Sequence, residues 1–370
     1  MGTRFDARRF LLALAAPVLA VIVALLITCV ILLAAGSSVS GFLSTIFTAP
    51  AARNVINILN NASILYLSGL AAAIGFRMNL FNIGVEGQYQ VAVFSAAVFA
   101  AQGWLPGPLN VVAAIIVAMV VGAAWASIAG LLKVTRGVSE VISTIMLNAI
   151  AVSLTAYLLR KVGQTTGSNL ATKQIPKDSW VSGIPLLPSA PNEVLGLSLL
   201  AVVGGVAYSI LLNRSRFGFE LRATGTSASA AVASGIDVRR MVVVSMVISG
   251  AVAGLIGMPL LFGDSHNYGT TFQSGIGFAG IAVALLGRNN PVGIAVGALL
   301  FSYLSEQSNL LEIKAQVSPD IVSITQGVIV LAVVIAYEVV RRYRTALEQQ
   351  RVAAELNRSA PAGATSEATR

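Results

Sequence analysis

Nine long runs without a charged residue dominate this chain and constrain its fold more than any other feature. A helix crosses the roughly 30 Å hydrocarbon layer of a bilayer in about 20 residues. Each central Leu, Ile, Val or Phe favours insertion by about 0.3 to 0.6 kcal/mol, whereas one central Arg, Lys or Asp costs about 2.5 to 3.5 kcal/mol. Uncharged runs of this length therefore predict membrane-spanning helices. They cover residues 10–36, 54–76, 87–132, 141–159, 194–213, 241–263, 265–287, 289–305 and 321–337.

The third run is too long for one helix, and a turn signal divides it at Gly103-Trp-Leu-Pro-Gly-Pro108. This division gives about ten transmembrane helices, so we expect an all-α integral membrane protein. Two runs predict a membrane-spanning helix less well than the others, because 265–287 is rich in glycine and 289–305 is short. One of them is a candidate for a broken or re-entrant segment, which is tolerated only where protein or a water-filled cavity surrounds it.

Composition excludes a soluble globular fold. Hydrophobic residues make up 56% of the chain and charged residues 11%, whereas soluble chains carry about 25% charged residues. The single cysteine, Cys29, and the single histidine, His266, exclude an internal disulfide and a cysteine–histidine zinc site.

Basic residues predict the orientation, because cytoplasmic loops of membrane proteins are enriched in Lys and Arg. With a cytoplasmic N-terminus and ten alternating helices, 18 of the 24 Lys and Arg fall inside and six outside. Both termini are therefore predicted to be cytoplasmic. This interpretation also accounts for the net charge of +9 without a nucleic-acid partner.

Two long loops and a tail complete the predicted organisation. The outer loop, residues 161–193, contains four prolines and is either a docking surface or a simple connector. The inner loop, residues 214–240, is predicted to hold a two-turn helix that Thr226 or Ser227 caps and Gly235 ends. We expect a transmembrane domain over residues 1–343 and a cytoplasmic tail over 344–370, helical at 345–357 and disordered at its end.

Small residues spaced four apart predict tight helix packing. Gly250 with Gly254, and Gly293 with Gly297, form two such pairs. In membranes, glycines at this spacing let helix backbones approach closely.

The chain carries no recognisable catalytic motif. Gly-Lys-Ser and Gly-Lys-Thr are absent, so the sequence lacks the phosphate-binding loop of an ATPase. A Gly-x-Ser-x-Gly elbow and a His-Glu-x-x-His helix are also absent. We expect no enzyme activity, no metal and no cofactor on this chain, and ATP hydrolysis would require a separate subunit.

Polar residues gather at two places between or within apolar runs. Residues 75–88 interleave apolar side chains with Asn79, Asn82, Glu86 and Gln88, which favours either a segment facing a pathway or a turn with capping residues. Glu140, Ser143, Thr144 and Asn148 follow one another on the fifth predicted helix, where they either face a cavity or join helices. Asn60 and Asn61 belong to the same class.

These motifs, taken together, are similar to those of the nucleoside and simple-sugar branch of bacterial ABC importer permeases. The resemblance covers roughly residues 51–340. The motifs that carry it are Phe81-Asn-Ile-Gly-Val-Glu-Gly-Gln88, Ser139-Glu-Val-Ile-Ser-Thr-Ile-Met-Leu-Asn148, residues 217–236, and residues 280–287 followed by Asn290-Pro291.

The resemblance implies a permease that moves nucleosides or related small polar solutes across the bacterial cytoplasmic membrane. It implies an ATPase subunit that binds ATP and Mg, a second, non-identical permease and an extracellular solute-binding lipoprotein. Expected pathway residues are Asn79, Asn82, Glu86, Gln88, Glu140 and Asn148. Expected ATPase-coupling residues are Gly218, Leu221, Arg222, Gly225, Ala230, Ala231, Gly235 and Ile236.

Three alternatives stay open. The first is an ion-coupled secondary transporter, which usually carries ionisable residues inside its helices. No carboxylate lies deep in the predicted spans, which counts against this alternative. An ABC permease for a simple sugar or a branched-chain amino acid would share the same plan. A membrane scaffold without transport activity would tolerate changes at Asn82, Glu86 or Asn148.

Overall fold

The computed structural model describes residues 22–34, 36–166, 169–269, 272, 274–315, 317–318 and 320–359. The chain divides into two units, which are Met1–Val39 with Asp320–Arg370, and Ser40–Pro319. The predicted helical residues 10–21 and the tail residues 360–370 lie outside the described residues.

The first unit contains the helix Ile22–Ala34 and α14 (Asp320–Ser359). The Thr28 hydroxyl donates to the Thr325 hydroxyl at 3.2 Å, and the Thr325 hydroxyl donates to the carbonyl of Ile321. α14 is 40 residues long, so the predicted span 321–337 and the predicted tail helix 345–357 form one continuous helix.

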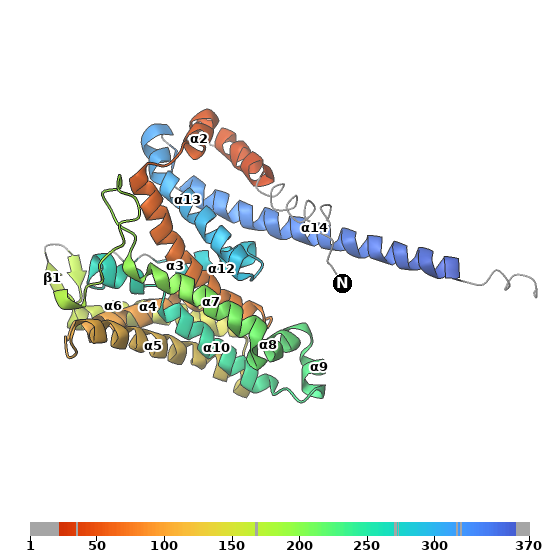
Figure 1. The fold of residues 1–370 in the computed structure, drawn as a ribbon, viewed down its shortest axis with the longest axis horizontal. Coiled ribbons are helices and arrows are strands. Elements are labelled where there is room, and N and C mark those ends of the chain that lie inside the picture. Colours follow the sequence, from red (N-terminus) through yellow and green to blue (C-terminus); the bar gives the residue numbers. More distant parts are fainter. Residues whose placement is uncertain are drawn as a thin grey trace, which may run out of the picture. The chain divides into compact units, whose positions relative to one another are not determined.

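The second unit is a helical bundle built around α3. α3 packs against α7, α10, α12 and α13, and α4 packs against α5 and α6 (Figure 1). The bundle elements are α2 (Val39–Ile46), α3 (Ala52–Phe76), α4 (Val85–Ala100), α5 (Gly107–Arg136), α6 (Glu140–Val162), α7 (Leu199–Arg214), α10 (Val238–Gly254), α12 (Ile276–Leu286) and α13 (Pro291–Ala315). The predicted division of run 87–132 is confirmed, because α4 ends at Ala100 and α5 begins at Gly107.

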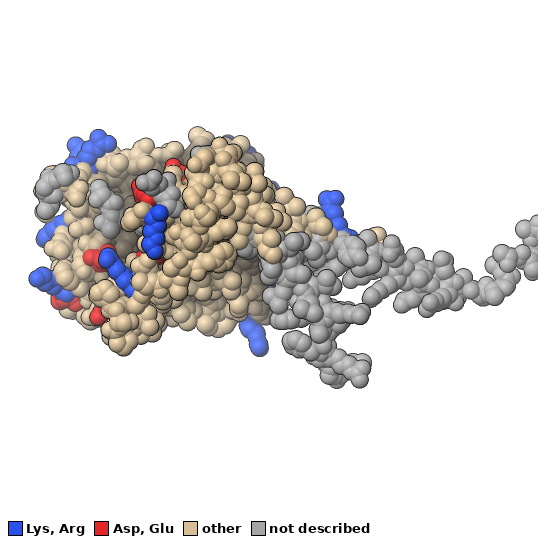
Figure 2. Space-filling view, turned by 90° about the horizontal axis from the view of Figure 1, so that it is seen from above, with Lys and Arg blue, Asp and Glu red and all other residues tan. Residues whose placement is uncertain are grey.

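The bundle presents an apolar exterior, as a membrane protein must. Within the described residues, five helices are long and apolar enough to cross a membrane, which confirms a multi-pass fold without fixing the number of crossings at ten. In the best window of α3, 67% of residues are buried, whereas in α5 only 22% are. Large apolar side chains such as Val120 and Val202 are exposed, and Figure 2 shows a broad uncharged face with charges gathered mainly at one end.

The predicted weak region contains a short helix. α12 has 11 residues, which span about 16 Å at 1.5 Å per residue and cannot cross 30 Å of hydrocarbon. It is preceded by α11 (Met258–Leu260) and a π-helical turn (Leu261–Ser265). α13, by contrast, runs ten residues beyond the predicted end at Ser305 and includes Glu306.

The proline-rich loop contains no long helix, as predicted. It carries a small antiparallel hairpin, β1 (Gln164–Thr166) with β2 (Asn169–Ala171), in which Gln164 pairs with Ala171. A 3₁₀ turn (Lys177–Ser179) follows, and a second one (Gly196–Ser198) leads into α7. The hairpin and an isolated antiparallel bridge between Ile184 and Val194 are the departures from an all-α fold among the described residues.

The predicted short helix in the 214–240 loop is confirmed. α8 (Arg216–Thr226) is followed by α9 (Ala228–Ala233), and the Ser227 side chain caps α9 by accepting from the amide of Ala230 at 3.3 Å. Gly235 follows with φ of 82°, in the left-handed region that glycine adopts at a helix end.

Glycines bring α5 and α10 into backbone contact. A Cβ atom at Gly250 would clash with the carbonyl oxygen of Gly122, and one at Gly254 would clash with that of Ala118. The close packing predicted from the Gly250–Gly254 spacing is therefore confirmed. At the second pair, a Cβ atom at Gly293 would clash with the carbonyl of Gly287, whereas one at Gly297 would stand 3.3 Å from the Leu286 side chain.

We predict that Gly250→Ala lowers the thermal stability of the purified protein, because overpacking a close contact typically costs about 1–3 kcal/mol. The matched control is Gly327→Ala in α14, where an added Cβ would meet nothing within 4 Å. Melting temperatures in detergent would measure both. Equal melting temperatures for the two variants would contradict close packing of α5 on α10.

Candidate functional site

A buried amide pair holds the segment that enters α4. The Asn82 side chain donates to Gln88 Oε1 at 3.1 Å, and Gln88 Nε2 donates back to Asn82 Oδ1 at 3.0 Å. Asn82 also donates to the Ser249 hydroxyl of α10 at 2.8 Å, which in turn donates to the carbonyl of Ala71 in α3. All three side chains are buried, so this chain of hydrogen bonds fixes α3, α4 and α10 to one another.

The Glu86 carboxylate binds the N-terminus of α12. One oxygen accepts from the Gly275 amide at 2.8 Å and from Gln90 Nε2 at 2.7 Å, and the other accepts from the Gly277 amide at 2.7 Å. The first amides of a helix have no partner within the helix, and its positive dipole end favours an anion. Glu86 is therefore the cap of this short helix, and it is only 2% exposed.

Glycine is required where α12 meets Glu86. A Cβ atom at Gly277 would clash with the backbone of Glu86, and one at Gly280 would clash with the side chain of Ser68. The Ser68 hydroxyl donates to the carbonyl of Ile276 at 3.0 Å. The glycines that make residues 265–287 a poor candidate for a membrane-spanning helix are thus the residues that let α12 approach α3 and α4.

Asn148 joins α6 to the start of α4. Its Oδ1 atom accepts from the Gly87 amide at 2.9 Å, and its Nδ2 atom donates to the carbonyl of Ile83 at 2.9 Å. Asn148 is buried, and a Cβ atom at Gly87 would stand 2.8 Å from Asn148 Oδ1. The side chain thereby replaces hydrogen bonds that the backbone at the start of α4 would lack in lipid.

The remaining two predicted pathway residues lie apart from this network. Glu140 is buried at the start of α6 and forms an ion pair with Lys133 near the end of α5. Asn79 is exposed in the turn after α3, with φ of 60°. The structure thus brings together Asn82, Glu86, Gln88 and Asn148, and it adds Ser68, Gln90 and Ser249, whose roles depend on contacts that sequence spacing does not reveal.

The predicted coupling residues lie on α8, α9 and the turn that follows. Leu221 and Ala231 are buried, whereas Ala230 is exposed. Arg222 donates to the carbonyl of Leu212 in α7, and a Cβ atom at Gly225 would clash with the carbonyl of Arg77. A Cβ atom at Gly218 would clash with the carbonyls of Leu211 and Leu212, while Gly235 and Ile236 follow α9.

The residues of α9 differ in their exposure. Ala231, one of the predicted coupling residues, is only 3% exposed and faces the bundle. Val232, the next residue, is 60% exposed. On α9, Ala230 and Val232 are therefore exposed, whereas Ala231 belongs to the buried side of the helix.

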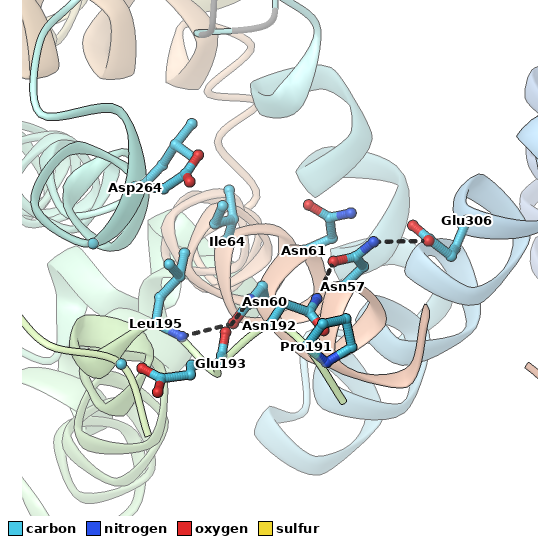
Figure 3. Close-up of a pocket in the computed structure, with 13 residues that line it drawn as sticks. Asn57, Asn60, Asn61, Ile64, Pro191, Asn192, Glu193, Leu195, Asp264 and Glu306 are labelled. Carbon is cyan, nitrogen blue, oxygen red and sulfur yellow. Dashed lines mark hydrogen bonds between the residues drawn. The ribbon is translucent and has the colours of Figure 1, made fainter. Parts of the chain in front are cut away.

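A polar pocket opens at the end of the bundle where α3 begins. Its volume is about 510 Å³, and α3, α13, the turn at Asp264 and the segment before α7 line it (Figure 3). α3 contributes Asn57, Asn60, Asn61 and Ile64, which share one helix face because residues three, four and seven apart align. The Asn60–Asn61 pair therefore faces a cavity, one of the two alternatives for polar residues within a span.

Two of these amides are fixed by neighbouring segments. Asn57 Nδ2 donates to Glu306 Oε1 at 2.9 Å, and Asn57 Oδ1 accepts from the Asn192 side chain at 2.7 Å. Asn60 Oδ1 accepts from the Leu195 amide at 2.9 Å. The pocket wall is therefore held rigid by hydrogen bonds between α3, α13 and the loop before α7.

A second cavity of about 430 Å³ lies between α4, α6 and the hairpin. Gln90, Thr155 and Tyr268 give it polar groups, while Val152, Leu159 and Leu170 make it otherwise apolar. Gln90 connects this cavity to the Glu86 network. Among the described residues, no group of three or more His, Cys, Asp or Glu side chains could hold a metal ion.

Comparison with known proteins identifies the family of this chain. Residues 54–334 match the family model described as "Branched-chain amino acid transport system / permease component". The chain is 34% identical to the guanosine ABC transporter permease protein NupP of Bacillus subtilis, over 87% of this chain and 93% of that protein. It is 31% identical to the nucleoside ABC transporter permease protein NupB of Lactococcus lactis, over 87% and 90%.

The glucose ABC transporter permease protein TsgB13 of Haloferax volcanii is 30% identical, over 96% of this chain and 94% of that protein. These matches cover nearly the whole of each relative. The chain therefore belongs to the branched-chain amino acid transport system permease family, in the branch that contains nucleoside and sugar ABC transporter permeases.

Proposed function

We propose that this chain is the transmembrane subunit of an ATP-driven importer that moves nucleosides or related small polar solutes across the cytoplasmic membrane. The observation that carries the proposal is its similarity, over almost full length, to permeases named for nucleosides and guanosine. A polar pocket of about 510 Å³ at one end of an otherwise apolar bundle fits a solute of this kind.

The pocket and the hairpin face outward, and α8 and α9 face the cytoplasm. The excess of basic residues on the side of the 214–240 loop supports this orientation, which places both termini inside. The outer segment between α6 and α7 then offers a surface for an extracellular solute-binding lipoprotein. Its hairpin and 3₁₀ turns give that surface a defined shape.

Coupling to ATP hydrolysis takes place at α9. A separate ATPase subunit binds ATP and Mg and contacts the exposed residues Ala230 and Val232. A second, non-identical permease completes the pathway. Movement of the ATPases then shifts α9 and with it α8, which packs on α7 and on the turn after α3. This shift biases the bundle between outward and inward states.

The pathway residues act by positioning. Asn82, Glu86, Gln88 and Asn148 bond to one another, to Ser249 or to backbone groups, so their polar atoms are already satisfied. Their proposed role is to hold α12 and the start of α4 beside the path. Glu140, paired with Lys133, fixes the inner end of α6, and Asn79 lies in the inner turn.

Ion-coupled transport is the second candidate, and one observation favours it. Glu306 lies within α13 and accepts a hydrogen bond from Asn57, so a carboxylate does occur inside a helix of the bundle. Intramembrane carboxylates often carry coupling ions. The energy source of uptake separates this candidate from the importer.

We predict ATP-dependent uridine uptake by proteoliposomes that contain this chain, the second permease and the ATPase, with the solute-binding protein added outside. Uptake should stop without ATP, because ATP hydrolysis drives the importer. It should persist when ionophores dissipate the proton and sodium gradients. Radiolabelled uridine would measure it. Uptake that needs an ion gradient, or that proceeds without the ATPase subunit, would contradict the importer.

We predict that Val232→Arg reduces co-purification of the ATPase at least tenfold, because the new charge lies on the exposed face of α9. The fold should be unaffected, since the side chain is not part of the core. The control is Leu186→Arg, a similarly exposed apolar residue in the segment between α6 and α7. Equal recovery of the ATPase with both variants would argue against coupling through α9.

A further inference from the structure

The pocket at the start of α3 combines amide groups with negative charge. Glu193, Asp264 and Glu306 line it, and the lining contains no Lys, Arg or His. These carboxylates come from three separate segments, which are the loop before α7, the end of the π-helical turn and α13. Their potential is strengthened by the low-dielectric helix walls around them.

Part of this lining is free to bind a solute. Figure 3 shows Asn61 between Asp264 and the Asn57–Glu306 pair in this view, with no hydrogen bond from Asn61 or from Asp264 to the other residues drawn. The neighbouring amides Asn57 and Asn60 are held by the contacts described above. Asn192 Oδ1 is buried in the wall and has no hydrogen-bond partner. The sides of the pocket are therefore fixed by hydrogen bonds, and Asn61 and Asp264 present polar groups in its lining.

The chemistry of these groups selects a class of solute. Ionised carboxylates only accept hydrogen bonds, while an amide both donates and accepts, so the lining matches hydroxyl groups and ring amides or amines. Its volume of about 510 Å³ is in the range of sites for small molecules. A phosphate group would bring negative charge beside three carboxylates without a cation to balance it, and such juxtaposition is strongly unfavourable.

We infer that this pocket is an outer vestibule of the transport path, which admits neutral or cationic polyhydroxylated solutes and rejects phosphorylated ones. The inference rests on the proposed import function, to which it adds the location of a solute-binding pocket and its selectivity for solutes by charge. Asp264 and Glu306 supply the negative potential, and Asn61 supplies hydrogen bonds to the solute. Discrimination against nucleotides is then a property of the permease itself as well as of any binding protein.

The potential in the pocket can be measured with thiol reagents of opposite charge. In a Cys29→Ser background, Asn61→Cys and Pro191→Cys place a thiol in the pocket, and Gln102→Cys places one in the exposed turn between α4 and α5. At each thiol, the measured quantity is the labelling rate of the cationic methanethiosulfonate reagent divided by that of the anionic one. We predict that this ratio is at least ten times higher at the pocket thiols than at Gln102→Cys. Adding Asp264→Asn and Glu306→Gln should reduce that preference at least threefold.

The solute class is tested by protection of the same thiols in the assembled transporter. We predict that uridine slows labelling of Asn61→Cys in a saturable way and that uridine 5′-monophosphate at the same concentration does not. Glu312→Gln, an exposed carboxylate further along α13, is the matched control and should leave both results unchanged. Equal charge preference at all three thiols, or equal protection by both compounds, would overturn the vestibule.

Failure of the vestibule and failure of the proposed function are distinguishable. Charge preference is a property of the pocket and is measured without ATP or transport. Uridine uptake that is ATP-dependent, with no charge preference at the pocket thiols, would refute the vestibule alone. Absence of ATP-dependent uptake would refute the import function and, with it, the assignment of the pocket to a transport path.

Discussion

The contact between the Glu86 carboxylate and the amides of Gly275 and Gly277 is the interaction on which the bundle depends. Hydrocarbon offers no hydrogen bonds, so a helix that stops within a membrane must have its end satisfied by protein. α12, with 11 residues, is too short to cross the hydrocarbon layer, and the two oxygens of Glu86 accept from amides at its N-terminus. The carboxylate in turn is stabilised by the helix dipole and by Gln90, so neither the charge nor the break in the helix is left uncompensated.

Local sequence signals predicted much of the fold. The Pro-Gly turn at residues 103–108 predicted the boundary between α4 and α5, Ser227 and Gly235 predicted α9, and the Gly250–Gly254 spacing predicted tight helix packing, although not that α5 is the partner. Each of these depends on residues that are near one another in sequence. The apolar pattern predicts an end at Ser305, before the charge of Glu306. In the bundle Glu306 accepts a hydrogen bond from Asn57, and α13 continues to Ala315.

The candidate sites were predictable only in part, for the same reason. The polar motif around Glu86 stood out as unusual, but its partners Gly275 and Gly277 are about 190 residues away, and nothing local links them. The pocket is assembled from four segments, of which the sequence marked only Asn60 and Asn61. Spacing on α3 shows which amides share a face, whereas the position of Asp264 and Glu306 opposite that face is a tertiary property. The two sites differ, since the network around Glu86 joins helices to one another and the pocket at the start of α3 presents polar groups in its lining.

Hydrogen–deuterium exchange of the α12 N-terminus in a Glu86→Ala variant is the most direct test of this account. The variant removes both acceptors, so exchange at Gly275 and Gly277 should increase at least tenfold, while α5 and α10 peptides, which are held by glycine packing, should stay protected. Glu140→Ala, which removes a carboxylate bonded to Lys133 instead, should leave α12 unchanged. Unaltered protection of the α12 N-terminus in Glu86→Ala would contradict the central role of this carboxylate.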